Sequence, residues 1–484
     1  MTILWKACLA CALLTGFYTV AGSAAPSAPP PKALPTVDVR ACGAKGVGTH
    51  DGTAAIRRAM SAVASIGVGT TPPPTPAADP VAAINAAKAG DTVTVAAGTF
   101  AGSTRITIPD GVTVQGAGMD SSWLQGDITY GSNCTVRDIK LGTAGYSVQN
   151  RANASSTLFE RCRFRGGGGS GDARNCVVRL GTYGSCDHIT FKDCLVERNL
   201  GDEDSSYSQG YNNIGCLENG ATASGSHLDS ITFIGCHIGV SNGRTDIPRN
   251  IGCPRMSMEF YTAEIPGVNR AYHGWSNVEV IDCVFEASDM CCIDLADTLD
   301  ASGQHISGPA LIRGCTLKGG GYDGKYWGYT ICCEAPKGVV IENNTFYRAH
   351  DNTLTVEESQ GVETSGYVIR NNVFALDVDN GITPGTYSMV LLRGSNHVFT
   401  GNTITTNSGS TVLELQYSSN STISGNTLNE LRSSNTPAAM QISHVTGATI
   451  SGNTFRTAAT TDPVIHYSGT NSNNTLSGNV FLHN

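Results

Sequence analysis

Thr422-Ile-Ser-Gly-Asn-Thr-Leu428 and Thr449-Ile-Ser-Gly-Asn-Thr-Phe455 are two copies of one seven-residue pattern. In each copy two apolar or β-branched residues precede a small or polar pair, followed by Asn, a variable residue and an apolar residue. The pattern recurs upstream with Cys in place of Asn, as in Thr190-Phe-Lys-Asp-Cys-Leu-Val196. A coil this short cannot bury its own apolar face, so such repeats must stack on one another. The pattern therefore predicts a β-solenoid.

The fifth position of the pattern is one structural slot that takes two residue types. An Asn there can hydrogen-bond to backbone and to the Asn of the next coil, whereas a free Cys is a small buried hydrophobe of similar volume. We expect the five Cys to be buried and mostly reduced. The alternative is bridging between neighbours, because strands about 4.8 Å apart are within disulfide reach, although their Cβ vectors are parallel. The slot holds Cys162, Cys194, Cys236, Cys283 and Cys315, then Asn344, Asn372, Asn402, Asn426, Asn453 and Asn479.

The repeats resemble those of the pectate-lyase-like right-handed parallel β-helix superfamily. The N-terminal part is similar too: Gly43–Ile56 resembles the Gly-rich turn before a capping helix, and Gly90–Phe100 and Ile108–Gly118 resemble first coils. The resemblance implies an all-β fold, a single-stranded right-handed parallel β-helix with a short N-terminal helical cap. Ala54–Val63 and Pro80–Lys88 have the helical character expected of that cap.

The resemblance does not specify an activity. The superfamily holds lyases, hydrolases, epimerases and non-enzymatic adhesins or tailspikes. The polygalacturonase-type Asn-Thr-Asp, Asp-Asp and Arg-Ile-Lys motifs are missing, and His273-Gly274 lacks the flanking glycines. Pro248–Arg255 is only superficially similar to the Arg-x-Pro-x-x-Arg pattern of pectate lyases. No family-specific catalytic residue can therefore be carried over to this sequence.

The N-terminus has the order of a secretory signal. Lys6 precedes an apolar stretch, Cys8–Val20, which is too short to span a bilayer, and small residues follow it. We expect a signal peptide over residues 1–24, a Pro/Ala-rich linker over 25–41, the cap and first coils over 42–110, and the β-helix over 111–484. The protein is therefore expected to be secreted, with no membrane span in the mature chain.

Charge excludes some partners. The formal net charge is −9, and only 15% of the residues are charged. Nucleic acids and anionic membrane surfaces demand basic patches, so neither is an expected partner. The overall charge does not exclude a neutral or an acidic polysaccharide, because local charge decides that interaction.

A second strand recurs between the slots, as in Met256-Ser-Met-Glu259, Cys291-Cys-Ile-Asp294 and Ile331-Cys-Cys-Glu334. Its first and third residues are apolar almost throughout, so the second and fourth are expected to face solvent. On that register five carboxylates form one acidic stripe along an outer face, with Arg179 and Arg393 at its ends: Glu218, Glu259, Asp294, Glu334 and Glu357. Cys292 and Cys332, in second positions of adjacent coils, become the best candidates for a disulfide.

Like charges stacked on a sheet are destabilising and need a reason. One reading is a solvated face balanced by Lys and Arg from loops. Another is a carbohydrate groove in which crowded carboxyls act as acid and base, with Glu259, Asp294 and Glu334 as catalytic residues and Glu218, Glu357 and Arg393 binding substrate. A third is a Ca²⁺ site with oxygen ligands from neighbouring coils.

The longest loops flank this stripe and carry aromatic residues: Tyr272 and Trp275 in one, Tyr326 and Trp327 in another. Aromatic rings stack on the apolar faces of sugars, so these four are candidate substrate-binding residues. The alternative is that they anchor the loops to the solenoid. Coils after Arg393 are short-looped and are expected to be structural.

The sequence thus favours an extracellular polysaccharide lyase, hydrolase or epimerase. A non-catalytic glycan-binding or cell-surface β-helix protein is the alternative.

Overall fold

The computed structural model describes residues 79–102, 105–143, 145–166, 176–181, 184–198, 212–216, 227–240, 256–260, 274–286, 288, 290–296, 307–321, 328–334, 337–358, 363–375, 387–406, 411–431, 438–457 and 464–483. The expected signal peptide, the linker and Ala54–Val63 lie outside these residues. Among the described residues, no helix is long and apolar enough to cross a membrane.

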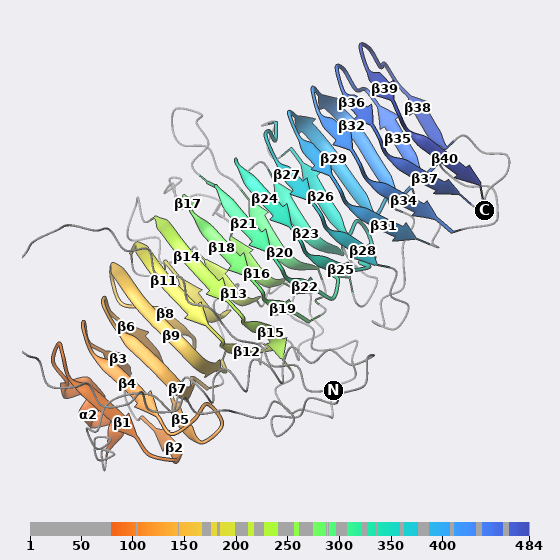
Figure 1. Ribbon diagram of the computed structural model, residues 1–484. Coiled ribbons are helices and arrows are strands. Elements are labelled where there is room, and N and C mark those ends of the chain that lie inside the picture. The colour runs from red at the N-terminus through yellow and green to blue at the C-terminus, as the bar shows by residue number, and fades with distance from the viewer. Residues whose placement is uncertain are drawn as a thin grey trace, which may run out of the picture. The chain divides into compact units, whose positions relative to one another are not determined.

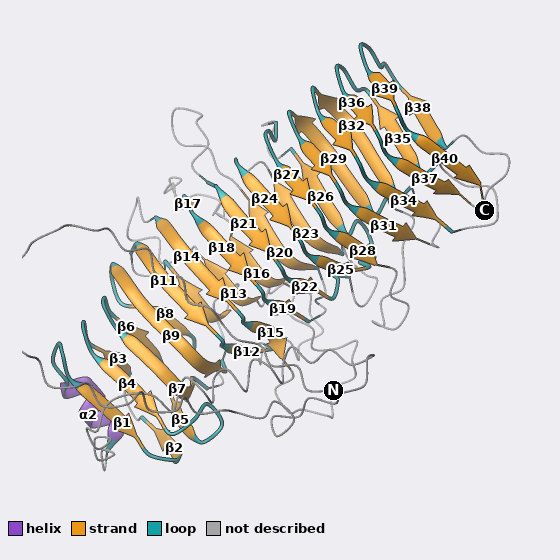
Figure 2. Cartoon of the chain, in the orientation of Figure 1, coloured by secondary structure: helices purple, strands orange, loops and turns teal. Residues whose placement is uncertain are grey.

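The described strands form two parallel sheets, which stack coil upon coil (Figures 1 and 2). Within each sheet the described strands pair in parallel, and a strand pairs with those of the preceding and following coils. The fold class predicted from the repeats is confirmed: this part of the chain is a parallel β-helix. It is preceded by one described helix, α2 (Pro80–Ala86), whose first turn is capped by the Asp79 side chain.

Sheet B supplies one strand per coil. Its 13 strands within the described residues are β3 (Ile106–Ile108), β6 (Ile128–Tyr130), β8 (Val148–Asn150), β10 (Cys176–Leu180), β13 (Asn212–Cys216), β16 (Met256–Phe260), β20 (Cys291–Ala296), β23 (Tyr329–Glu334), β26 (Leu354–Glu357), β29 (Val390–Ser395), β32 (Leu413–Ser419), β35 (Met440–Ser443) and β38 (Ile465–Ser468).

Sheet A contains the seven-residue repeats and has two ladders of strands, joined through the long strands β7 and β9. Its 27 strands within the described residues are β1 (Thr92–Val95), β2 (Gly98–Ala101), β4 (Thr113–Gly116), β5 (Ser122–Gln125), β7 (Thr135–Leu141), β9 (Ala154–Phe164), β11 (Cys186–Lys192), β12 (Leu195–Glu197), β14 (Leu228–Ile234), β15 (His237–Val240), β17 (Trp275–Ser276), β18 (Val278–Ile281), β19 (Val284–Phe285), β21 (Ala310–Arg313), β22 (Thr316–Leu317), β24 (Val339–Glu342), β25 (Thr345–Tyr347), β27 (Val368–Arg370), β28 (Val373–Ala375), β30 (Val398–Thr400), β31 (Thr403–Thr406), β33 (Thr422–Ser424), β34 (Thr427–Glu430), β36 (Thr449–Ser451), β37 (Thr454–Thr457), β39 (Thr475–Ser477) and β40 (Val480–His483).

The bend between the two ladders explains the small or polar pair of the repeat. The residue just before each slot has a positive φ, for example 52° at Asp193, 57° at Asn343 and 63° at Gly425. Gly, Asn and Asp tolerate this left-handed conformation better than other residues. The chain can therefore turn inward at the same point of every coil, which places the slot residue in the interior.

The slot residues form two consecutive ladders. The five Cys are at most 1% exposed and unbridged, which confirms the predicted thiol ladder. Their thiols donate to backbone carbonyls, as Cys194 does to Phe159 at 3.5 Å. In the Asn ladder, each side chain bonds to the preceding and following coils. The Nδ2 of Asn372 donates to the Ile341 carbonyl at 2.9 Å and to the Asn402 side chain at 3.0 Å.

The core between the sheets is continuous. Aromatic side chains stack from coil to coil, with ring centroids of Phe159 and Phe191 5.1 Å apart and those of Phe191 and Phe233 4.8 Å apart. Burial of this apolar surface is the main stabilising contribution in a solenoid, because each coil covers the open face of its neighbour.

Candidate functional site

The outer face of sheet B carries two rows of side chains, fixed by the strand register. The first row is Arg179, Gly215, Glu259, Asp294, Cys332, Thr355, Leu391, Glu414 and Gln441. The second row lies two residues further along each strand and contains Glu334 and Glu357, which are direct partners. Arg393 and Gln416 continue it through side-chain contacts.

The expected single stripe of five carboxylates is therefore wrong. Glu259 pairs with Asp294 in the first row, and Glu334 pairs with Glu357 in the second. Asp294 is opposite Cys332, so the two pairs are offset by two residues, on the order of 7 Å along the strands. Glu218 lies outside the described residues.

The expected register is two residues out, because Cys291 lies opposite Tyr329 and Ile293, not Cys291, lies opposite Ile331. Both Cys292 and Ile293 belong to the hydrophobic core, and the strand register passes from Cys291↔Tyr329 directly to Ile293↔Ile331. This corrects the predicted Cys292–Cys332 disulfide. Cys292 is inside the solenoid, whereas Cys332 packs on the outer face with Met290 and Cys291, and both thiols are free.

A cavity of about 370 Å³ opens on this outer face over β23, β26, β29, β32 and β35. Its volume falls within the range of roughly 300–1,000 Å³ that is usual for small-molecule sites. Polar side chains predominate in the lining, which consists of Tyr329, Asp351, Asn352, Glu357, Tyr387, Ser388, Leu391, Arg393, Thr411, Glu414, Gln416 and Gln441.

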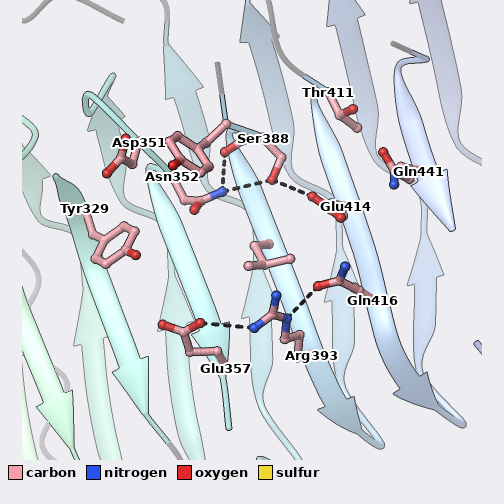
Figure 3. Close-up of a pocket in the computed structure, with 12 residues that line it drawn as sticks. Tyr329, Asp351, Asn352, Glu357, Ser388, Arg393, Thr411, Glu414, Gln416 and Gln441 are labelled. Carbon is pink, nitrogen blue, oxygen red and sulfur yellow. Dashed lines mark hydrogen bonds and ion pairs between the residues drawn. The ribbon is translucent and has the colours of Figure 1, made fainter. Parts of the chain in front are cut away.

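Two hydrogen-bonded chains cross the strands within this cavity (Figure 3). In one, Asn352 Nδ2 donates to Ser388 Oγ at 2.9 Å, and Ser388 Oγ donates to Glu414 at 3.2 Å. In the other, Arg393 donates to Gln416 at 2.7 Å and to Glu357 at 3.3 Å. Each chain holds side chains from three coils in fixed positions, which is the preorganisation that a binding site requires.

Burial raises the pKa of three ionisable groups in the cavity lining. Burial raises the pKa of Glu357, with Arg393 opposing and Glu334 and Glu358 adding to the increase. Burial also raises the pKa of Asp351, although the Gly328 amide and His350 oppose it. The Tyr329 phenol has a raised pKa for the same reason, so it is a hydrogen-bond donor at neutral pH. Ionisable groups with shifted pKa values in a cleft are typical of functional sites.

The structure places some of the predicted site residues in the cavity and others elsewhere. Glu357 and Arg393 line the cavity, whereas Glu259, Asp294 and Glu334 lie outside its lining. Trp275 is 1% exposed, packs on Phe260 and donates from Nε1 to the Ala296 carbonyl, so it is a core residue with no surface to offer a sugar. Tyr272, Tyr326 and Trp327 lie outside the described residues.

The sequence reading missed the C-terminal half of the cavity. Asn352, Ser388, Glu414 and Gln441 were not candidates, and the coils after Arg393 were expected to be purely structural. The alternation of apolar and polar residues could have indicated these positions. Glu414 and Gln441 are the polar second residues of Leu413-Glu-Leu-Gln416 and Met440-Gln-Ile-Ser443.

A group of three side chains that could hold a metal ion spans the two rows. One atom each of Cys332, Glu334 and Glu357 comes within 4.8 Å of the others. Ca²⁺ takes roughly six to eight oxygen ligands. A buried thiol with a raised pKa and two carboxylates therefore fit Ca²⁺ poorly.

Comparisons with known proteins identify the superfamily. A family model described as a right-handed β-helix region matches residues 267–428 and 310–481, and one described as rhamnogalacturonase A/epimerase, pectate lyase-like, matches residues 36–258. The chain belongs to the pectate-lyase-like right-handed parallel β-helix superfamily. Comparison with curated proteins gave no match.

The chain is also similar to several solved structures. The A-module of a mannuronan C-5 epimerase from Azotobacter vinelandii is 15% identical at a TM-score of 0.42, over 92% of this chain and 98% of that one. A surface adhesin of Streptococcus pneumoniae is 11% identical at a TM-score of 0.48, over 92% of both chains. The Dettilon tailspike protein is 14% identical at 0.47, over 88% of this chain and 67% of that one.

Proposed function

We propose that the chain is a secreted carbohydrate-active protein that binds a polysaccharide in the sheet B cavity and hydrolyses its glycosidic bonds. The main observation behind this proposal is the position of Glu357. This carboxyl lines the cavity, burial raises its pKa, and Glu334 is its direct partner on the neighbouring strand. Lyase and epimerase reactions on the same acids are the alternative chemistries.

The two carboxyls suit complementary roles. Glu357, with the raised pKa, would give its proton to the leaving oxygen as the glycosidic C–O bond breaks, and the Glu334 carboxylate would bond to the anomeric carbon. Water, deprotonated by Glu357, would then displace Glu334 and release the sugar. Retaining glycosidases place their two carboxyl groups about 5–5.5 Å apart. The carboxylate oxygens of Glu334 and Glu357 approach within 4.8 Å, which supports that mechanism. Glu259 and Asp294, paired in the first row, are the alternative acid pair.

The experiment is digestion of a panel of polysaccharides, with reducing ends, 4,5-unsaturated products and C-5 inversion measured on the same samples. We expect new reducing ends without unsaturated products. Glu357→Gln should then cost on the order of 10²-fold in rate, the usual contribution of a general acid. Asp294→Asn tests the alternative acid pair, and Glu160→Gln on sheet A is the matched control.

A second candidate function, glycan binding without catalysis, is supported by the ion pair that holds Glu357 against Arg393. It predicts binding without products of any kind, and unchanged binding in Glu357→Gln. Each assay is repeated with a chelator, and loss of activity and of melting temperature on chelation would instead support a Ca²⁺ site.

A further inference from the structure

Carboxyl groups outnumber cations in the described lining of the cavity. Asp351, Glu357 and Glu414 carry carboxyls, and Arg393 carries the one guanidinium of these lining residues. Towards β16, the same outer face continues with further acids in the two rows, Glu259, Asp294 and Glu334. Even when Glu357 carries its proton, the other acids outnumber Arg393, so the local potential over the cavity and along its approach is negative.

The guanidinium of Arg393 is already engaged. It lies 3.3 Å from Glu357 and donates to Gln416 at 2.7 Å. A bound carboxylate would have to compete with Glu357 for that charge whenever Glu357 is ionised, and it would share the cavity with Glu414 in either case. Juxtaposed like charges cost several kcal/mol at an interface, so an anionic sugar has no compensated position in this part of the cavity.

The remaining lining is suited to hydroxyl groups. Asn352, Gln416 and Gln441 offer amides that both donate and accept, and the Glu414 carboxylate accepts. Hydrogen bonds from a hydroxyl to a carboxylate are short and strong. Leu391, in the first row between Thr355 and Glu414, gives the floor an apolar patch on which the carbon face of a sugar ring can rest.

We propose that the glycan bound in this cavity is an uncharged, hydroxyl-rich polysaccharide rather than a polyuronate, and that Glu414 is a specificity determinant against anionic sugars. This inference rests on the proposed function of the same cavity. It concerns only which polymer enters, because Glu414 takes no part in the proposed acid pair.

The test measures the affinity of the full chain for neutral glucans, mannans and galactans, for polygalacturonate and alginate, and for the amino-sugar polymer chitosan. Wild type should bind a neutral polymer and neither polyuronate. Glu414→Lys should raise polyuronate affinity by roughly tenfold or more, since a reversed charge near the ligand acts through Coulomb attraction. Glu160→Lys makes the same charge change on sheet A and should leave polyuronate affinity unchanged.

The possible results distinguish the inference about the bound polymer from the proposed carbohydrate function. Tighter wild-type binding of a polyuronate or of chitosan than of every neutral polymer overturns the inference and leaves the carbohydrate function standing. Equal gains in Glu414→Lys and Glu160→Lys also overturn it, because net charge would then explain them. Binding of no polymer overturns both. Glu414→Gln, the milder change, decides the matter if the Lys variant fails to fold.

Discussion

Arg393 and Glu357 form an ion pair between neighbouring coils, with a guanidinium nitrogen 3.3 Å from a carboxylate oxygen. The pair is partly exposed, so its contribution to stability should be small, about 0–1 kcal/mol. The pair also affects the titration of the cavity, because the Arg393 charge opposes the burial that raises the pKa of Glu357.

Replacing Arg393 with Gln should raise the pKa of Glu357 further, because the opposing positive charge is lost. If Glu357 is the proton donor, activity requires its protonated form, so the alkaline limb of the kcat/KM profile should move to higher pH. A pH series of wild type and variant measures this. Arg370→Gln, which removes a comparable partner of Glu342 on sheet A, should leave the limb in place.

His397 should make stability depend on pH. Its Nε2 lies 2.7 Å from the Arg393 carbonyl and its Nδ1 accepts from the Tyr367 amide, so the buried ring is neutral. Burial lowers its pKa from 6.5 to about 4. As the pH falls, this histidine is therefore protonated in the unfolded chain before it is protonated in the folded protein. The stability that the neutral ring contributes is fully present above pH 6.5 and is lost as the pH falls towards 4.

Urea unfolding of wild type and His397→Gln between pH 7 and pH 4 tests that dependence. The difference in unfolding free energy between the two proteins should shrink as the pH falls. A constant difference for His397→Gln would contradict the assignment.

We expect Trp275 to contribute to the stability of the fold and not to glycan binding. Trp275→Ala removes a fully buried ring and should lower the free energy of unfolding by about 3–5 kcal/mol. Trp275→Phe keeps most of the packing and loses only the bond to the Ala296 carbonyl, so it should fold and bind glycans with unchanged affinity. If the folded Trp275→Phe variant bound glycans more weakly than wild type, Trp275 would again be a candidate sugar-binding residue.

The Asn ladder should be costly to interrupt. In Asn372→Ala, two donors of Asn344 and the Ile341 carbonyl lose their partner inside the core. Unsatisfied buried groups cost about 1–3 kcal/mol each, so urea unfolding should show a loss of at least that size. Asn429→Ala removes one half-buried bond to Thr405 and should cost less.

The repeats predicted the fold because each coil contains the same turn, and Gly, Asn or Asp before the slot marks that turn in the sequence. The site was harder to predict. Alternation locates outward positions only if it is unbroken, and Cys292 and Ile293 both point inward. An apolar pattern of period two also fits a register shifted by two residues, so it aligns Asp294 with Glu334, whereas the structure pairs Asp294 with Cys332. Glu357 and Arg393 were found because the alternation before them is regular.

The Asn ladder also bears on how such a chain could lengthen. Each Asn in the middle of the ladder bonds only to the coil before it and the coil after it, and its bonds are the same at every step. A tandem duplication of one coil would therefore extend the ladder without leaving an amide unpaired at the junction. The near-identical copies at Thr422–Leu428 and Thr449–Phe455 are what such a duplication would leave behind. The sheet B strands of these two coils, β32 and β35, also line the cavity, so growth by copying whole coils there would lengthen the polar face beside it.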